Sequence, residues 1–208
     1  MRALVLEEFG GPFVLKQVET PRIGPYEALV RVRNVGVCGT DLKIRAGRMG
    51  LNVLPLIMGH EVAGEVAEVG SEVRGIAPGD RVTVNFYVTC GQCQFCREGR
   101  DTLCQDVRQH GFSLDGGLAE YVKPPGVNLC PVPDHVPLER ACILADAVAT
   151  SYHAVTKRAQ VRPGKTVALV AQGRIHPVID RVFPLEDVEL AFEALRQGQS
   201  LGRNVVAV

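Results

Sequence analysis

The sequence lacks net charge, long apolar runs and any Gly-x-Gly spacing. Its 23 basic and 23 acidic side chains cancel, which argues against a general affinity for nucleic acid or for an anionic membrane. No segment approaches the length of a membrane span and the first residues do not form a signal peptide, so we expect a cytoplasmic protein. Without Gly-x-Gly, the phosphate-binding turn of a dinucleotide-binding fold is missing.

The 208 residues suffice for one large domain with a real core, and 46% of them are apolar. In the first half, short β-branched runs alternate with turns that contain glycine and proline, which predicts β-structure. We expect strands at Ala3 to Leu6, Val14 to Val18, Ala28 to Val35, Val62 to Val69, after the Pro78-Gly79 turn, and at Leu118 to Val122. Many short strands of this kind favour a compact, irregular barrel or sandwich.

The second half has a different character. From Pro137 to Val155 the sequence has few helix breakers and predicts one or two helices. Residues 163–170 predict a turn and a buried strand, but no phosphate-binding turn follows them. Pro184 to Arg196 predicts an amphipathic helix with acidic residues in its first turn, and Asn204 to Val208 a final strand.

Seven cysteines need an explanation, because cytosolic proteins rarely keep structural disulfides and clustered cysteines there are more often metal ligands. Cys90, Cys93, Cys96 and Cys104 are closely spaced, and four thiolates give zinc a closed tetrahedral shell, which is typical of a structural site. The alternatives are an iron–sulfur cluster, a redox dithiol or four idle thiols. The bacterial iron–sulfur motif places its fourth cysteine sooner and follows it with proline, whereas Gln105 follows here.

A second group of potential ligands lies earlier in the chain. Cys38 and His60 sit on two different turns, each beside a predicted strand. A thiolate and an imidazole are half of a zinc site, so a third ligand must come from elsewhere. A lone cysteine usually belongs to the core, and a lone histidine beside a glutamate is usually a surface pair. These residues alone therefore leave the second metal site open.

Five motifs occur in a specific order along the chain: Cys38-Gly-Thr-Asp, Gly59-His-Glu-Val-Ala-Gly, the four cysteines, Asp115-Gly-Gly-Leu-Ala-Glu-Tyr and Asp146-Ala-Val-Ala-Thr-Ser-Tyr. Together they resemble the medium-chain zinc-dependent alcohol dehydrogenases, specifically their GroES-like catalytic domain, over nearly the whole chain. The resemblance implies a mainly β fold with some α. That fold is an irregular GroES-like barrel with flanking helices and a zinc-binding lobe at about residues 86–112.

The resemblance implies that Cys38, His60 and Asp146 bind a catalytic zinc ion, besides the structural zinc of the four cysteines. Many members of the family have cysteine where this chain has Asp146. A carboxylate in that position keeps the fourth coordination site open and makes the ion a harder Lewis acid. Glu61, next to His60, corresponds to a residue that can enter or leave the inner coordination sphere.

Three further residues take roles from the resemblance. Asp41 is expected to hold the ring of His60 in one tautomer. Thr40 resembles the hydroxyl that accepts the alcohol proton, a role that requires a metal to lower the alcohol's pKa. Many relatives pass that proton to a histidine three residues later. This chain has Lys43 there, so the outward leg of the relay differs.

The resemblance also implies a missing part. In the family, a nucleotide-binding domain of about 100–150 residues follows the segment that ends here at Val170. We expect that this domain has been lost between about Val170 and Ala171. The chain would then be a single catalytic domain, residues 1–208, made of an N-terminal part (1–170) and a rejoined C-terminal part (171–208). The exposed face should be apolar and invite self-association, while the usual family dimer is lost and the chain is monomeric or associates differently.

The family oxidises alcohols to aldehydes or ketones with NAD or NADP, so a small alcohol or carbonyl compound is the implied substrate. Thr150 and Arg203 resemble coenzyme contacts on the catalytic side, but two contacts are too few to bind NAD or NADP. Hydride transfer needs a nicotinamide held at near-attack distance. We therefore expect little or no dehydrogenase turnover from this chain alone.

Two other functions stay open from the sequence: a non-catalytic zinc-stabilised β scaffold, and hydrolysis by water on an exposed zinc ion. A scaffold has no need of the Cys38–His60–Asp146 set. Cys130 and Cys142 are predicted to be buried thiols, because free cysteine packs readily. The remaining histidines are predicted to be structural or surface residues: His110, His135, His153 and His176.

Overall fold

The structure is a computed structural model that describes residues 1–50, 53–160, 179–200 and 202–208. The strand predicted within residues 163–170, the junction between Val170 and Ala171, and His176 lie outside these ranges. In the described residues the fold is mainly β with a few short helices, as predicted, and contains no complete Rossmann domain. No helix in these ranges is both long and apolar enough to cross a membrane.

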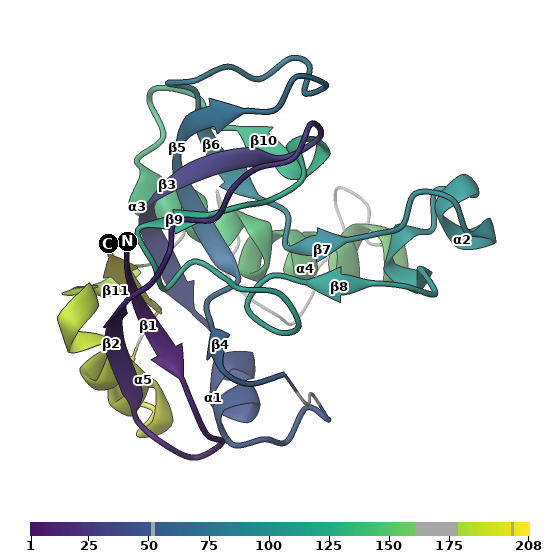
Figure 1. The fold of residues 1–208 in the computed structure, drawn as a ribbon. Helices are drawn as coiled ribbons and strands as arrows, with labels where there is room; N and C mark the ends of the chain where they lie inside the picture. The colour runs from purple at the N-terminus through teal and green to yellow at the C-terminus, as the bar shows by residue number, and fades with distance from the viewer. Residues whose placement is uncertain (51–52, 161–178, 201) are drawn as a thin grey trace.

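A sheet of seven strands forms the centre of the molecule, with the order β10-β6-β5-β3-β12-β11 and β9 paired to β3 (Figure 1). The bounds are β3 Ala28–Val37, β5 Glu61–Val69, β6 Arg81–Val84, β9 Tyr121–Val122, β10 Leu129–Pro131, β11 Ile179–Pro184 and β12 Arg203–Ala207. All pairs are antiparallel except β11 with β12. Such a sheet buries one set of alternating side chains, and Val30, Val32 and Val35 of β3 are fully buried.

Two smaller sheets complete the β-structure. β1 (Arg2–Leu6) pairs with β2 (Phe13–Gln17) and β4 (Leu56–Ile57), and β7 (Tyr87–Val88) pairs with β8 (Arg108–Gln109). The strand predicted at Leu118 to Val122 is shorter than expected. Only β9 is a strand there, since Leu118 bonds to Met58 and to Leu4 of β1, and Ala119 forms a bridge with Ala3 of β1.

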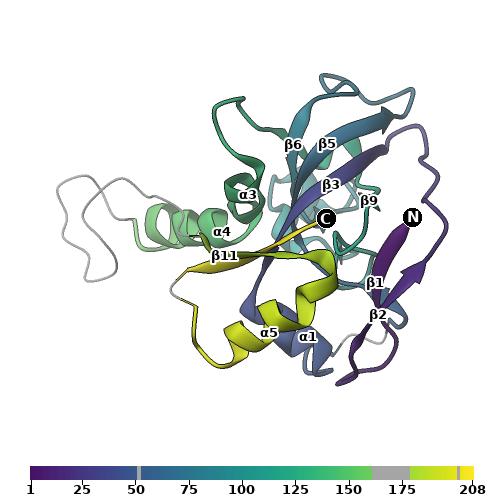
Figure 2. The ribbon, with the colours of Figure 1, turned by 90° about the vertical axis from the view of Figure 1, so that its left-hand side faces the viewer.

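The helices are short and lie around the central sheet (Figures 1 and 2). They are α1 Gly39–Arg45, α2 Gln94–Arg97, α3 Leu138–Ala141, α4 Ala147–His153 and α5 Val188–Arg196. The predicted helical stretch after Pro137 is α3, a 3₁₀ turn at Cys142–Ala145, and α4, which continues into a π-helical turn at Ala154–Arg158. The predicted C-terminal helix is confirmed as α5, which directly follows a 3₁₀ turn at Leu185–Asp187. A separate 3₁₀ turn at Gly126–Asn128 lies between β9 and β10.

The predicted amphipathic face of α5 joins two parts of the core. Val188, Ala191 and Phe192 are buried, and the Phe192 ring meets the Phe13 ring edge-on at a centroid distance of 5.1 Å. Such an aromatic pair adds to the free energy gained from burial alone. The α5 face therefore ties β2, near the start of the chain, to the C-terminal region.

An arm projects from the rest of the molecule (Figure 1). It contains β7, α2, a 3₁₀ turn at Asp101–Leu103 and β8, and coincides with the predicted zinc lobe. The arm carries the four clustered cysteines. The other predicted metal ligands lie where the central sheet meets α1 and α4.

Candidate metal centres

Cys38 stands at the junction of β3 and α1, as the residue that caps the helix. The backbone N–H of Cys38 donates to Asp41 Oδ2 at 2.8 Å, and the backbone N–H of Thr40 donates to the Cys38 sulfur at 3.5 Å. These two bonds form a reciprocal capping box that fixes the first turn of α1. The local sequence Cys-Gly-Thr-Asp thus orients the thiol.

His60 and Glu61 lie where β5 begins. The preceding Gly59 has a φ of +92°, and a Cβ there would come within 2.8 Å of Val35, so only glycine fits this turn. Glu61 is the cross-strand partner of Gly36 near the end of β3. This register brings the start of β5 beside the end of β3 and so places His60 next to Cys38.

Asp146 completes the cluster from the second half of the chain, as the residue that precedes α4. Its Oδ2 lies 3.5 Å from Cys38 Sγ and 3.5 Å from His60 Nε2. Tetrahedral zinc with one sulfur, one nitrogen and one oxygen ligand requires separations of about 3.6 Å and about 3.4 Å for these pairs. With Glu61 included, the four potential ligand atoms lie within 4.8 Å of one another. The predicted ligands therefore fit a zinc ion in spacing and in chemistry.

The charges around His60 favour a cation. Burial would lower the pKa of His60, but Asp41 and Asp146 outweigh it and raise that pKa to about 12. The hydrogen bond from His60 in turn lowers the pKa of Asp146 well below its usual range. Two carboxylates thus surround an imidazole that is 1% exposed. A divalent ion between His60, Asp146 and Cys38 would balance this negative charge.

Glu61 is fully buried beside the cluster, and its carboxylate Oε1 accepts a hydrogen bond from Arg203 Nη2 at 2.5 Å. Its other oxygen, Oε2, is buried without a hydrogen-bond partner among the described residues. That oxygen lies against Gly36, where a Cβ would come within 2.0 Å of it. Burial raises the pKa of Glu61 to about 7, although Arg203 opposes this shift. Arg203 is therefore the main partner of a buried acid.

Three side chains take positions in this region that the sequence analysis did not predict. The rings of Phe86 and Phe112 each lie 5.0 Å from the His60 ring and enclose it on the side of the arm. Thr150, predicted as a coenzyme contact, donates its hydroxyl to Asp146 Oδ1 at 2.7 Å. Its spacing of four residues from Asp146 within one helical stretch could have suggested this bond.

Asp41 positions His60 in the way the sequence predicts for this pair. Its Oδ1 lies 3.1 Å from His60 Nδ1, and Asp41 is 1% exposed. Replacing Asp41 with alanine is expected to weaken zinc binding at the Cys38–His60–Asp146 site by about 10–100-fold, because the ring loses its orienting partner. Chelator competition on the folded variant measures this loss. The four-cysteine site, which Asp41 does not touch, should keep its affinity in the same titration.

The four clustered cysteines converge at the tip of the arm. Cys93 Sγ lies 3.5 Å from Cys96 Sγ, and Cys90 Sγ lies 4.0 Å from Cys96 Sγ. These values bracket the sulfur separation of about 3.8 Å in tetrahedral zinc thiolate. The backbone N–H groups of Cys96 and Gln105 lower the pKa of Cys93 to about 6, which favours the thiolate that zinc requires.

All seven cysteines lie in the described ranges, and none of them forms a disulfide. Cys142 is buried, as predicted, but the prediction for Cys130 is wrong because its side chain is exposed. Cys130 lies on β10, where Leu129 takes the inward position and the alternation turns Cys130 outward. His110 is buried, while His135 and His153 lie at the surface. These positions agree with the structural and surface roles predicted for them.

Comparisons with known proteins agree with the geometry. The sequence model described as "Alcohol dehydrogenase GroES-like domain" matches residues 24–134, and the one described as "Zinc-binding dehydrogenase" matches residues 115–206. An alcohol dehydrogenase of Geobacillus stearothermophilus is 37% identical over 210 residues, which cover 100% of this chain and 58% of that protein. Alcohol dehydrogenase 1 of Emericella nidulans is 39% identical over 82% of this chain and 49% of its own.

Solved structures show the same relationship. Alcohol dehydrogenase TADH from Thermus sp. ATN1 has a TM-score of 0.72 and 34% identity, covering 88% of this chain and 50% of its own. An NAD-dependent alcohol dehydrogenase has a TM-score of 0.90 over 100% of both chains at 21% identity, which shows the shared fold. The chain thus spans a little over half of the curated relatives that match it along its whole length. It belongs to the zinc-dependent alcohol dehydrogenases of the medium-chain family, through its GroES-like domain.

Proposed function

We propose that this chain is the zinc-binding catalytic domain of an enzyme that oxidises alcohols to aldehydes or ketones with NAD or NADP. The observation that carries the proposal is the convergence of Cys38, His60 and Asp146 at spacings that fit zinc. Three protein ligands leave the fourth position of a tetrahedral ion open, which is the arrangement of a catalytic site. A purely structural site, such as the four cysteines would form, is closed.

Hydrogen bonds from neighbouring side chains orient two of the proposed ligands, His60 and Asp146. Asp41 accepts the N–H of His60 Nδ1, which turns Nε2 toward Asp146 and Cys38, where its lone pair would bind a zinc ion that replaces the Nε2 proton. Thr150 binds one oxygen of Asp146 and leaves the other, Oδ2, facing the cluster. Zinc bound here would supply a Lewis acid that lowers the pKa of an alcohol hydroxyl. In this proposal Thr40, which neighbours Cys38 on α1, accepts the alcohol proton.

Glu61 and Arg203 add an ion pair beside the proposed ligands. Their ion pair holds the Glu61 carboxylate by one oxygen at the back of the site, and the second oxygen has no partner in the described residues. The proposal includes Glu61 as an additional, reversible ligand. Arg203 and Thr150 are proposed coenzyme contacts as well, and both already contact residues of the metal cluster.

The number of zinc ions per chain tests the proposal most directly. We expect two per chain in the wild type and one in Cys38→Ala, because the alanine removes the only thiolate of the open site. Elemental analysis of chelator-washed protein measures both values, and Cys130→Ala, an exposed thiol outside both clusters, is the matched control. One zinc ion in both wild type and Cys38→Ala would leave only the four-cysteine site and support a non-catalytic scaffold.

The chain alone is expected to have negligible dehydrogenase turnover, because nothing in its described part would hold a nicotinamide at near-attack distance. NADH formation with a panel of primary and secondary alcohols measures this rate. Chelator-sensitive ester hydrolysis in the same preparation would indicate that exposed zinc activates water instead. Ordinary alcohol oxidation rates would show that the separate nucleotide-binding domain is not needed.

A further inference from the structure

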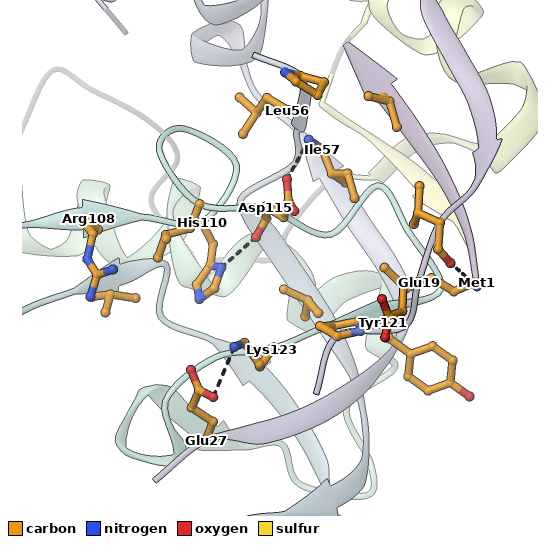
Figure 3. A pocket seen from close by; sticks show the side chains of 18 of the residues that line it. Met1, Glu19, Glu27, Leu56, Ile57, Arg108, His110, Asp115, Tyr121 and Lys123 are labelled. Carbon is orange, nitrogen blue, oxygen red and sulfur yellow. Dashed lines mark hydrogen bonds and ion pairs between the residues drawn. The ribbon is translucent and has the colours of Figure 1, made fainter. Parts of the chain in front are cut away.

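A cavity of about 470 Å³ lies between the β1–β4 sheet and the base of the arm (Figure 3). Its volume falls within the range of small-molecule sites. Leu56, Ile57 and Val122 contribute apolar wall, while His110 and Lys123 contribute polar groups. None of the residues that line the cavity belongs to either metal cluster. The cavity is therefore separate from the site proposed for alcohol oxidation.

The wall contains a polar atom without a partner. His110 is 4% exposed, and its Nδ1 lies 2.8 Å from the backbone oxygen of Asp115. A carbonyl oxygen can only accept, so Nδ1 carries the proton and donates it. Burial also lowers the pKa of His110, which keeps the ring neutral. Nε2 is then a bare acceptor, and it is buried with no hydrogen-bond partner among the described residues. An unsatisfied buried acceptor costs free energy that a suitable donor would recover.

The surroundings of Nε2 determine what kind of donor fits. Figure 3 shows the ring of His110 with Nδ1 turned to Asp115 and its other edge turned toward Lys123 and Glu27. Lys123 Nζ is already engaged with Glu27 Oε2 at 3.2 Å. The carboxylates of Glu19 and Glu27 also line the cavity. Cationic groups line it as well, namely Arg108, Lys123 and the amino group of Met1, so charges of both signs are present and a neutral donor is favoured over an ion of either sign.

We propose that this cavity binds a small neutral molecule with an apolar body and one hydroxyl group, whose O–H donates to His110 Nε2. The apolar body lies against Leu56 and Ile57, both buried in the wall. Because Nε2 is buried, the proposal requires the cavity wall to rearrange locally before the hydroxyl reaches it, and the partly exposed Lys123 is the side chain of that wall toward which Nε2 is turned. The proposal is independent of the metal cluster, so it can fail without affecting the proposed function.

Cyclohexanol and methoxycyclohexane are the probes for a direct test, since the ether has a similar apolar body but no donor. The zinc-loaded chain, labelled with ¹³C in its histidine rings, is titrated with each probe and followed by NMR. We expect cyclohexanol to shift the His110 resonance saturably and to bind about tenfold more tightly than the ether, the effect of one hydrogen bond to a buried acceptor. Equal binding of the two probes, or no saturable shift, would overturn the proposal.

Variants separate this site from the metal centre. Cys38→Ser, which removes a ligand of the proposed catalytic zinc, should leave the cyclohexanol shift at His110 unchanged. His110→Phe should abolish the preference for the alcohol over the ether. If that variant does not fold, Leu114→Trp fills the cavity from its half-buried wall and should abolish binding of both probes. Loss of the His110 shift in Cys38→Ser, or wild-type binding in Leu114→Trp, would place the alcohol elsewhere.

Discussion

We expect Cys104→Ala to remove one zinc ion per chain and to unfold the outer part of the arm, residues 90–105. Between Val88 and His110, Cys104 is the only buried residue, so the lobe has almost no hydrophobic core to hold it together without an ion. Structural zinc sites contribute about 10–16 kcal/mol of apparent binding free energy at neutral pH, far more than the contacts within this arm can replace.

Hydrogen exchange and elemental analysis measure this result together. We expect the amides of residues 90–105 to lose their protection in Cys104→Ala, while the central sheet keeps its own. Cys130→Ala is the control, because that thiol is exposed and lies on β10, away from both clusters. Retention of full protection in the arm of Cys104→Ala would show that the lobe folds without its zinc ion.

Replacing Arg203 with methionine is expected to destabilise the protein by about 2–3 kcal/mol at pH 9, where Glu61 is ionised in the folded wild type, because it leaves this buried charge without its partner. The Arg203 side chain is 19% exposed and that of Glu61 is fully buried, so solvent screens this pair little. Urea unfolding of the two proteins measures the difference. The double variant Arg203→Met with Glu61→Gln should recover most of it, because the unpaired charge is gone.

The loss in Arg203→Met also has a predicted pH dependence. Glu61 has a pKa near 4.5 when unfolded and about 7 in the folded wild type, so the folded state retains its proton longer. Stability therefore falls as pH rises through this window, and removing Arg203 extends the fall to higher pH. The deficit of the variant should nearly vanish toward pH 4.5, where Glu61 is protonated in the folded state of both the wild type and the variant.

Arg196→Met is the matched control for the same measurement. Arg196 pairs with Glu193 on the outer side of α5, where the two side chains are 66% and 42% exposed. Such surface pairs contribute at most about 1 kcal/mol. A loss in Arg203→Met no larger than that in Arg196→Met would mean that Glu61 is stable in the core as a neutral acid.

The two candidate metal sites differ in how far they could be predicted from the sequence. The convergence of the four cysteines of the arm could be predicted from their spacing, because 15 residues contain all four and the local turns bring them together, while their assignment to zinc drew also on the family resemblance. The open site could be assigned only with the help of the family resemblance, since no local pattern links Cys38 and His60 to Asp146. The open site depends on the pairing of Gly36 in β3 with Glu61 in β5, which sets the register of the two strands. The hydrophobic pattern of a single strand does not determine the residue of another strand with which it pairs.

Other features depend entirely on packing between distant segments. The partnership of Glu61 and Arg203 joins residues 142 positions apart, and a lone glutamate beside a histidine gives no sign of it. The same holds for Phe86 and Phe112 around His60, and for the burial of His110. Cys130 was predicted wrongly because a general preference for buried cysteine gives no information on which face of β10 it occupies.

The distribution of the ligands along the chain sets the order in which the two sites can load during synthesis. The four cysteines of the arm are complete as soon as Cys104 has left the ribosome, and their short loop closes at little entropic cost. Asp146 is made 86 residues after His60, and the Arg203 that holds Glu61 follows a further 57 residues later. Under the proposed function, a nascent chain would therefore bind its structural zinc ion early, whereas the open site would take a metal only after the sheet has closed.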